Sequence, residues 1–162
     1  VVFASLLFAT NASAEVYTTL EGTFNDIEIE DTNFHPLGVD ARLGVYIIQG
    51  LALEAHVGYG LLSGNEDDMD LSILYNAGLQ SRIILMDDRG STLFVLGGYS
   101  LSWLDLDRNE TGLPGEELLT GISYGLGFDI KLGSESSNVY WSAKGVRYYK
   151  TDDISIDTYS TG

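Results

Sequence analysis

Two residues of the chain have types and a spacing that could support hydrolysis. Glu54 and His56 lie two positions apart in a segment of alternating polarity, so in a β-strand both side chains would share one face. A carboxylate and a histidine are two parts of a Ser-His-acid arrangement, in which the histidine takes the proton of a nucleophilic hydroxyl. The serine would have to come from another strand, and no local pattern marks it.

The rest of the sequence supplies little for catalysis or for binding a cofactor. The sequence has no G-x-S-x-G elbow at a predicted strand-to-helix turn, since Gly121–Gly125, which fits the letters, continues into the alternating pattern of a strand. An H-E-x-x-H pair and a phosphate-binding loop are absent from the sequence. There is no cysteine, and His35 and His56 are the two histidines. We therefore expect no catalytic residue, no metal site and no cofactor, and we interpret His56 as a histidine satisfied by a carboxylate.

The net charge of the chain argues against some classes of binding partner. The 162 residues include 24 acidic and 8 basic side chains, which gives a formal net charge of −16. Binding of nucleic acid depends on clustered lysine and arginine, so we expect no nucleic-acid partner. At 44% hydrophobic residues, the chain is too apolar to be disordered and long enough to form one domain.

The elements that would position these side chains are β-strands. From residue 16 onward, apolar and polar residues alternate with the period of a strand. Short glycine-bearing turns are expected at 48–50, 87–90 and 133–136, and a further break at 151–153. Longer polar connections are expected at 26–36, 63–70 and 105–119. The eight predicted strands are 16–25, 37–47, 53–61, 71–85, 92–104, 123–132, 139–150 and 154–162.

Short and long connections would fall at opposite ends of an up-and-down meander, which closes into a barrel without exposed edges. The polar members of each strand are glycine, small polar residues and charges of both signs, which suit a narrow lumen better than a soluble surface. We therefore predict an all-β fold, an eight-stranded antiparallel up-and-down transmembrane β-barrel whose apolar side chains face lipid. A soluble ligand-binding barrel is the alternative.

The polar set places charged residues inside this barrel. Unpaired charges in a narrow lumen are costly, so acids and bases should pair across strands, with Glu54 pairing to Arg42 or Arg82. Switching of partners could gate a thin water path, but we favour a structural plug. Lys144 facing inward would put Arg147 on the lipid side. The predicted lumen network is Asp40, Arg42, Glu54, His56, Arg82, Asp129, Lys131 and Lys144.

Acidic residues concentrate in the long connections. Carboxylates can hold divalent cations and bridge them to lipopolysaccharide phosphates, although solvated loops that carry no ligand are the simpler interpretation. The predicted acidic surface loops contain Glu66, Asp67, Asp68, Asp70, Asp105, Asp107, Glu116 and Glu117.

The start of the chain has the pattern of an export signal. Val1–Thr10 is apolar and uncharged, and Ala12-Ser13-Ala14 is a small-residue cleavage pattern before Glu15. We predict a signal peptide over 1–14, clipped at its start, and a barrel domain over 15–162.

The chain resembles the small bacterial outer-membrane barrels, the OmpA-like transmembrane domain and the porin family. The resemblance is carried by Tyr17–Gly22, Leu51–Ala55, Ile122–Phe128 and Asp157–Gly162. It implies periplasmic termini, short periplasmic turns, long surface loops, and a last strand that ends in an aromatic residue read by the barrel-insertion machinery. The sequence stops at Gly162, so we expect this strand to continue further.

Together these features predict a monomeric outer-membrane protein of a Gram-negative bacterium. Its expected role is envelope structure and surface contact, and its partners are membrane lipid, lipopolysaccharide with divalent cations as bridges, and the insertion machinery. A small cation-preferring pore is the first alternative. A lipid-modifying enzyme that uses His56 is the second.

Overall fold

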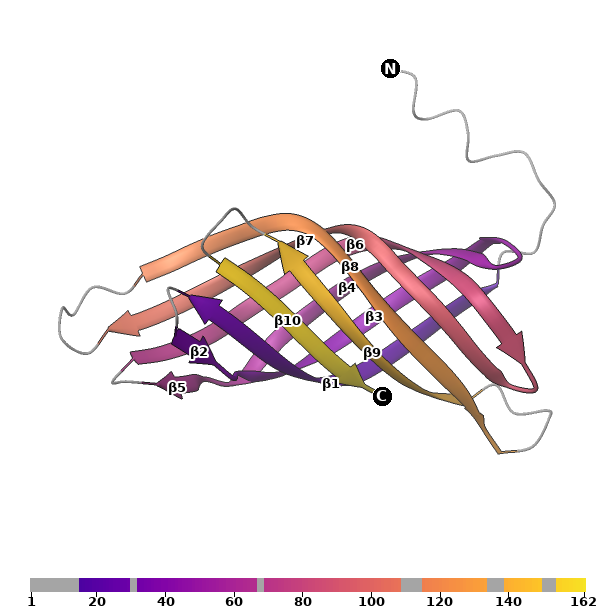
Figure 1. The fold of residues 1–162 in the computed structure, drawn as a ribbon, viewed down its shortest axis with the longest axis horizontal. Helices are drawn as coiled ribbons and strands as arrows, with labels where there is room; N and C mark the ends of the chain where they lie inside the picture. Colours follow the sequence, from indigo (N-terminus) through magenta and orange to yellow (C-terminus); the bar gives the residue numbers. More distant parts are fainter. Residues whose placement is uncertain (1–14, 30–31, 67–68, 109–114, 134–138, 150–153) are drawn as a thin grey trace, which may run out of the picture.

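The protein is an antiparallel β-barrel in a computed structural model that describes residues 15–29, 32–66, 69–108, 115–133, 139–149 and 154–162. Eight long strands pair with their sequence neighbours, and β10 pairs with β1 to close the ring (Figure 1). The short β2 and β5 pair with β1 and β6. The predicted fold is therefore confirmed. The elements are β1 (Val16–Ile29), β2 (Thr32–Phe34), β3 (Leu37–Ile48), β4 (Leu51–Leu62), β5 (Gly64–Glu66), β6 (Met69–Asp88), β7 (Ser91–Arg108), β8 (Gly115–Leu132), β9 (Val139–Tyr149) and β10 (Ile154–Thr161).

The two ends of the barrel differ in how their strands are joined. Two-residue turns, Gln49–Gly50 and Arg89–Gly90, lie at one end. Arg89 and Gly90 both have positive φ, 47° and 86°, as the tight hairpin turn that matches strand twist requires. β8 and β9 are also joined at this end, through residues 133–138, of which 134–138 lie outside the described residues. The other neighbouring long strands are joined at the opposite end (Figure 1). We call these the turn end and the loop end; in outer-membrane barrels they face the periplasm and the cell exterior.

The exterior of the barrel is apolar along most of its length. Leu20, Leu79 and Ile122 are 72%, 70% and 66% exposed, whereas the lumen residues Arg42, Glu54 and Arg82 are buried. In water such an exterior would be costly, whereas in a bilayer it contacts acyl chains. In this part of the barrel apolar side chains point outward and charged ones inward, which is the predicted orientation. No helix of the described residues is long and apolar enough to cross a membrane.

The strands extend further toward the loop end than the sequence indicated. Residues 26–29, 32–34, 64–66, 105–108 and 115–119, all predicted as loop, are strand. Their acidic residues resemble a loop composition, but these acids alternate with apolar residues that pack inside the barrel. The predicted connections at 26–36, 63–70 and 105–119 were therefore too long.

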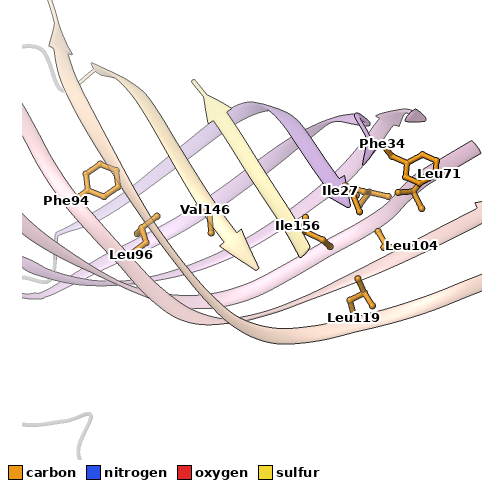
Figure 2. Close-up of a cluster of buried hydrophobic side chains, with 10 residues drawn as sticks. Ile27, Phe34, Leu71, Phe94, Leu96, Leu104, Leu119, Val146 and Ile156 are labelled. Carbon is orange, nitrogen blue, oxygen red and sulfur yellow. The ribbon is translucent and has the colours of Figure 1, made fainter. Parts of the chain in front are cut away.

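The inner face at the loop end is apolar. Leu71 and Ile73 were predicted to face lipid with Leu79, but both are buried. A register shift between Ile73 and Tyr75 in the β6–β7 pairing reverses which positions point inward, and this bulge explains the error. Figure 2 shows Phe34, Ile27, Leu71, Leu104 and Leu119 toward one end of the barrel and Phe94 and Leu96 toward the other.

Candidate functional site

The candidate site is a network of charged and polar side chains inside the barrel, centred on Glu54 of β4. The Tyr17 hydroxyl donates to Glu54 Oε1 at 2.5 Å. The two arginines expected beside Glu54 are both near it, with Arg42 Nη1 3.5 Å from Oε2 and Arg82 Nη1 3.5 Å from Oε1. All three ionic side chains are buried, so each charge depends on the others for its stability.

Arg42 of β3 connects the acids of the network. Its Nη2 lies 2.8 Å from Asp40 Oδ2, and its Nε lies 3.4 Å from Glu21 Oε2. Its Nη1 also donates to Gln80 Oε1 at 2.9 Å, and Gln80 Nε2 donates to Ser123 Oγ at 3.0 Å. One guanidinium therefore faces three carboxylates, including that of Glu54.

Glu21 of β1 joins the network to the last two strands. Lys144 Nζ of β9 lies 2.5 Å from Glu21 Oε1, and Ser160 Oγ of β10 donates to Glu21 Oε2 at 2.9 Å. Glu21 was not among the predicted lumen residues, because the alternation of apolar and polar residues in 16–25 is weak. The signal was present, since Glu21 has the same parity as Tyr17 and Thr23, and Thr23 is also buried.

Arg82 of β6 occupies the lumen toward the turn end. Its guanidinium forms an ion pair with Asp129 of β8 and stacks 3.6 Å from the ring centroid of Phe94. Cζ of the same guanidinium lies 5.5 Å from the centroid of the Tyr17 ring. A cation held between aromatic rings and two carboxylates fills this part of the lumen with side chains.

His56 lies between an acid and a serine, but the acid is not the one that the sequence suggested. Its Nδ1 is 3.5 Å from Asp40 Oδ1, and its Nε2 is 3.3 Å from Ser100 Oγ. Ser100 in turn donates to Ser123 Oγ at 3.0 Å. All these side chains are buried, so an acyl substrate would have to displace the lumen side chains to reach Ser100.

Lys131, the remaining predicted member, lies at the turn end. Its backbone N donates to the carbonyl of Gly90 at 2.7 Å, and its side chain is half-buried. Lys131 is therefore placed at the mouth of the barrel, beside the Arg89–Gly90 turn.

Glycine provides the room that this network needs. A Cβ on Gly44 would overlap the Tyr17 ring, and a Cβ on Gly127 would overlap Phe94 and Lys144. Each glycine lies directly across from the large side chain on the neighbouring strand, Gly44 from Tyr17 and Gly127 from Phe94. The lumen is thus narrow enough that large residues are accommodated only opposite residues without a side chain.

The network draws on all eight long strands and is close to charge balance. Four carboxylates face two arginines, one lysine and His56. Such a set can hold the barrel in one register, because a shifted strand would turn its charged residues toward lipid. Its buried ionisable members are Glu21, Asp40, Arg42, Glu54, His56, Arg82 and Lys144, with Asp129 at the edge.

Most of the predicted acids lie on strands at the loop end, where Asp105 is half-buried and Glu116 is exposed. Asp105 lies opposite Glu116, and Asp70 opposite Asp107. Trp103 Nε1 donates to Glu116 Oε2 at 3.3 Å, and Trp103 packs 5.4 Å from Tyr75. Glu66, Asp70, Asp105, Asp107, Glu116 and Glu117 therefore lie in strands rather than loops, whereas Asp67 and Asp68 lie outside the described residues. The described residues contain no group of three or more acids or histidines arranged to hold a metal ion.

Arg147 of β9 lies on the barrel exterior, as the inward position of Lys144 required. Its Nε and Nη2 bond to Asp157 of β10 at 2.6 and 2.5 Å. Asp157 lies across the seam from Asp26, whose carboxylate is 3.5 Å from His35 Nδ1. The exterior arginine is thus neutralised by an acid in the neighbouring strand.

The fold is that of the small outer-membrane barrels. The chain is similar to Neisserial surface protein A, with a TM-score of 0.72, 12% identity and coverage of 91% of this chain and 95% of that one. It is also similar to Ail, the attachment invasion locus protein of Yersinia pestis, with a TM-score of 0.67, 14% identity and coverage of 92% and 95%. The chain is also similar to the N-terminal β-barrel domain of Pseudomonas aeruginosa OprF, with a TM-score of 0.55, 12% identity and coverage of 89% of this chain and 94% of that one.

No model of a known protein family matches the sequence, and neither does any curated protein. At 12 to 14% identity, the solved structures establish the fold. The predicted resemblance to small outer-membrane barrels is confirmed at that level. Together with the apolar exterior, this fold places the protein in an outer membrane.

Proposed function

We propose that the protein is a closed, non-enzymatic outer-membrane barrel that supports envelope structure and makes surface contacts at its loop end. The observation that carries this proposal is the filled lumen. Ionic side chains that contact one another occupy its middle, and apolar side chains lie inside the barrel at both ends. Export by a signal at 1–14, which lies outside the described residues, insertion by the barrel-insertion machinery and a monomeric state belong to the same proposal.

Closure favours a scaffold over a pore. An ion crossing the barrel would have to pass Phe34, Ile27 and Leu71 at the loop end, then the network, then Phe94 with the stacked Arg82. Breaking a buried ion pair to open such a path is costly. Purified protein in planar bilayers should therefore show no single-channel events, and reproducible cation-selective steps would favour the pore instead.

The lipid-modifying alternative rests on Asp40, His56 and Ser100. We propose that these residues are structural, since Asp40, His56 and Ser100 contact one another and Ser123 inside the filled lumen. Mass spectrometry of lipid A from cells with and without the protein should give the same profile. A change that requires both His56 and Ser100 would show that the protein is an enzyme.

The loop-end exterior supports contact with lipopolysaccharide. Tyr75 and Trp103 are the aromatic residues expected at a membrane interface, and Asp105 and Glu116 lie just beyond them toward the loop end. Carboxylates there would face lipid phosphates, so divalent cations would have to bridge the two. Thermal unfolding in lipopolysaccharide bilayers should shift to lower temperature on chelation, and an equal shift in phosphatidylcholine bilayers would contradict this contact.

A further inference from the structure

The lipid-facing surface ends at different heights on neighbouring strands. On β8, exposed apolar side chains continue toward the loop end as far as Leu118, and Glu116 is the next outward residue. On β9, by contrast, Arg147 interrupts the apolar surface where this strand pairs with Tyr124 of β8. Leu118 lies six residues beyond Tyr124 toward the loop end. The apolar surface is therefore taller on β8 than on β9.

The ionic character at the level of Arg147 continues across the seam between β10 and β1. Arg147 pairs with Asp157 of β10, and Asp157 lies directly opposite Asp26 of β1, on strands that Figure 1 shows side by side. All three side chains point outward, since a residue adjacent to each is buried inside the barrel: Val146, Ile156 and Ile27. Arg147, Asp157 and Asp26, which we call the ionic row, thus form a charged strip on the outside of the barrel.

Strand tilt explains only a small part of the difference in height. A line of paired residues that starts at Val16 returns to β1 at Asp26, ten residues closer to the loop end, after eight pairings. Each pairing therefore raises the line by slightly more than one residue, so Leu118 remains about five residues higher than Arg147. The line passes through Val16, Val45, Leu53, Ser81, Gly97, Tyr124, Arg147, Asp157 and Asp26.

The same line gives the heights in ångström. Ten residues of a strand tilted by about 40° span about 25 Å along the barrel axis, which is the height of the apolar band of an outer-membrane barrel. Val16 is the first exposed apolar residue of β1. Measured from it, a level band would end near Asp26, with Arg147 about 6 Å below its edge and Leu118 about 6 Å above it. A level hydrocarbon layer would therefore submerge an ion pair and leave Leu118 in water.

The ionic row is poorly suited to acyl chains because its charges do not balance. Arg147 binds both carboxylate oxygens of Asp157. Asp26 lies 3.5 Å from His35 Nδ1, and while that histidine is neutral the row has one cation for two carboxylates. Net charge among acyl chains is costly, whereas a local change in bilayer thickness costs little for each ångström. Descent of the headgroups to the row is therefore favoured over submersion of the row.

We infer that the ionic row binds the headgroup layer of the outer leaflet, which descends beside the seam and makes the hydrocarbon layer thinner along β9, β10 and β1 than along β7 and β8. Phe24 and Tyr159 lie next to the row on its turn-end side and are exposed, as aromatic residues just below headgroups are. A second copy of this chain is a poorer occupant, because it would bring the same excess of carboxylates. The inference goes beyond the proposed function, which also holds with a level bilayer.

Two tyrosines at equal height provide the test. Tyr159 pairs with Gly145, and the line through them reaches β7 at Val95. Three pairings raise that line by about four residues, so Tyr99 of β7 is level with Tyr159. The two side chains are similarly exposed, 57% for Tyr99 and 53% for Tyr159. The sequence has no cysteine, so Tyr99→Cys and Tyr159→Cys each accept one spin label.

Electron paramagnetic resonance in phosphatidylcholine vesicles measures how often each label collides with a water-soluble nickel chelate. The label at position 159 should collide about threefold more often than the label at position 99, because hydrocarbon excludes the chelate. Molecular oxygen, which concentrates in hydrocarbon, should show the opposite preference.

Removal of the charges tests whether the ionic row causes the difference. The test variant combines Asp26→Ala, Arg147→Ala and Asp157→Ala, and it should bring the two nickel collision rates to within about 1.5-fold, since no charge then holds the headgroups down. The matched control removes one arginine and two aspartates from the exposed turn and should keep the threefold difference: Asp87→Ala, Asp88→Ala and Arg89→Ala.

Three results would overturn the inference. Equal nickel collision at positions 99 and 159 in the otherwise unchanged protein would show that the bilayer boundary is level, and this comparison needs no charge variant to fold. Persistence of the difference in the folded test variant would show that the row does not cause it. A label at position 159 that is shielded from both nickel and oxygen until the protein is diluted in lipid would identify a second copy as the occupant.

Discussion

The two halves of the barrel are built with opposite polarity. Toward the turn end, β1 buries Glu21 and exposes Leu20, whereas toward the loop end the same strand buries Ile27 and exposes Glu28. This reversal occurs although the register of β1 with β3 and with β10 is continuous. Such a reversal is expected where a barrel passes from lipid into water, so we refer to the two parts as the membrane half and the loop half. On this strand the loop half is therefore packed like a soluble barrel, with its apolar residue inside, and the membrane half has the opposite arrangement.

The largest effect should come from the membrane half. Arg42→Asn leaves Glu21, Asp40 and Glu54 without their shared cation, and uncompensated buried charge destabilises by about 3–5 kcal/mol. Urea unfolding in vesicles, followed by heat-modifiable mobility, measures this change. The same substitution at Arg89, in the exposed turn where asparagine suits the positive φ, should have little effect. Comparable losses at both positions would argue that the network contributes no special stability.

The loop half can be tested through two leucines of one strand. Leu71→Ala removes a fully buried side chain and should cost about 2–4 kcal/mol, as in a soluble core. Leu79→Ala, on the lipid-facing surface, leaves no internal cavity and should lower the free energy of unfolding by less than Leu71→Ala does. If Leu79→Ala were the more damaging variant under the same urea unfolding, the contrast between the two halves would not hold.

Narrowness of the lumen predicts an intermediate effect. Gly44→Ala places a methyl group against the Tyr17 ring and should destabilise by about 1–3 kcal/mol. Gly97→Ala is the control, since nothing lies within 4 Å of a Cβ there. Differential scanning calorimetry of the two variants should show a lower Tm for Gly44→Ala only; equal Tm values would mean that the lumen has room to spare.

The smallest effect is expected on the exterior. Arg147→Ala breaks the pair with Asp157, but the arginine side chain is 45% exposed, and such pairs contribute about 0–1 kcal/mol. The loss should shrink further as salt is raised. A loss as large as that of Arg42→Asn would indicate that Arg147 lies within the hydrocarbon layer.

The alternation of apolar and polar residues was enough to predict the barrel, its orientation and most of the lumen residues. A period of two residues remains visible even where individual residues have a weak preference for strands. It could not locate the reversal along each strand. An acidic residue such as Asp105 is typical of a loop when it is considered alone. Its neighbour Leu104, which is buried, shows that the two residues continue the alternation of a strand. Nor could it find the bulge after Ile73, since an extra residue changes facing without changing composition. The partners of each charge depend on strand stagger, which is why His56 meets Asp40 instead of Glu54.

The seam between β1 and β10 joins residues 22–29 to residues 154–161. No complete ring can exist until both ends of the sequence have been synthesised and brought together, and contacts of such wide sequence separation form slowly. Before the seam closes, the chain would be a sheet with two unpaired edges and an apolar outer surface. Closure of this seam would therefore be the step that removes the last unpaired strand edges from the folding chain.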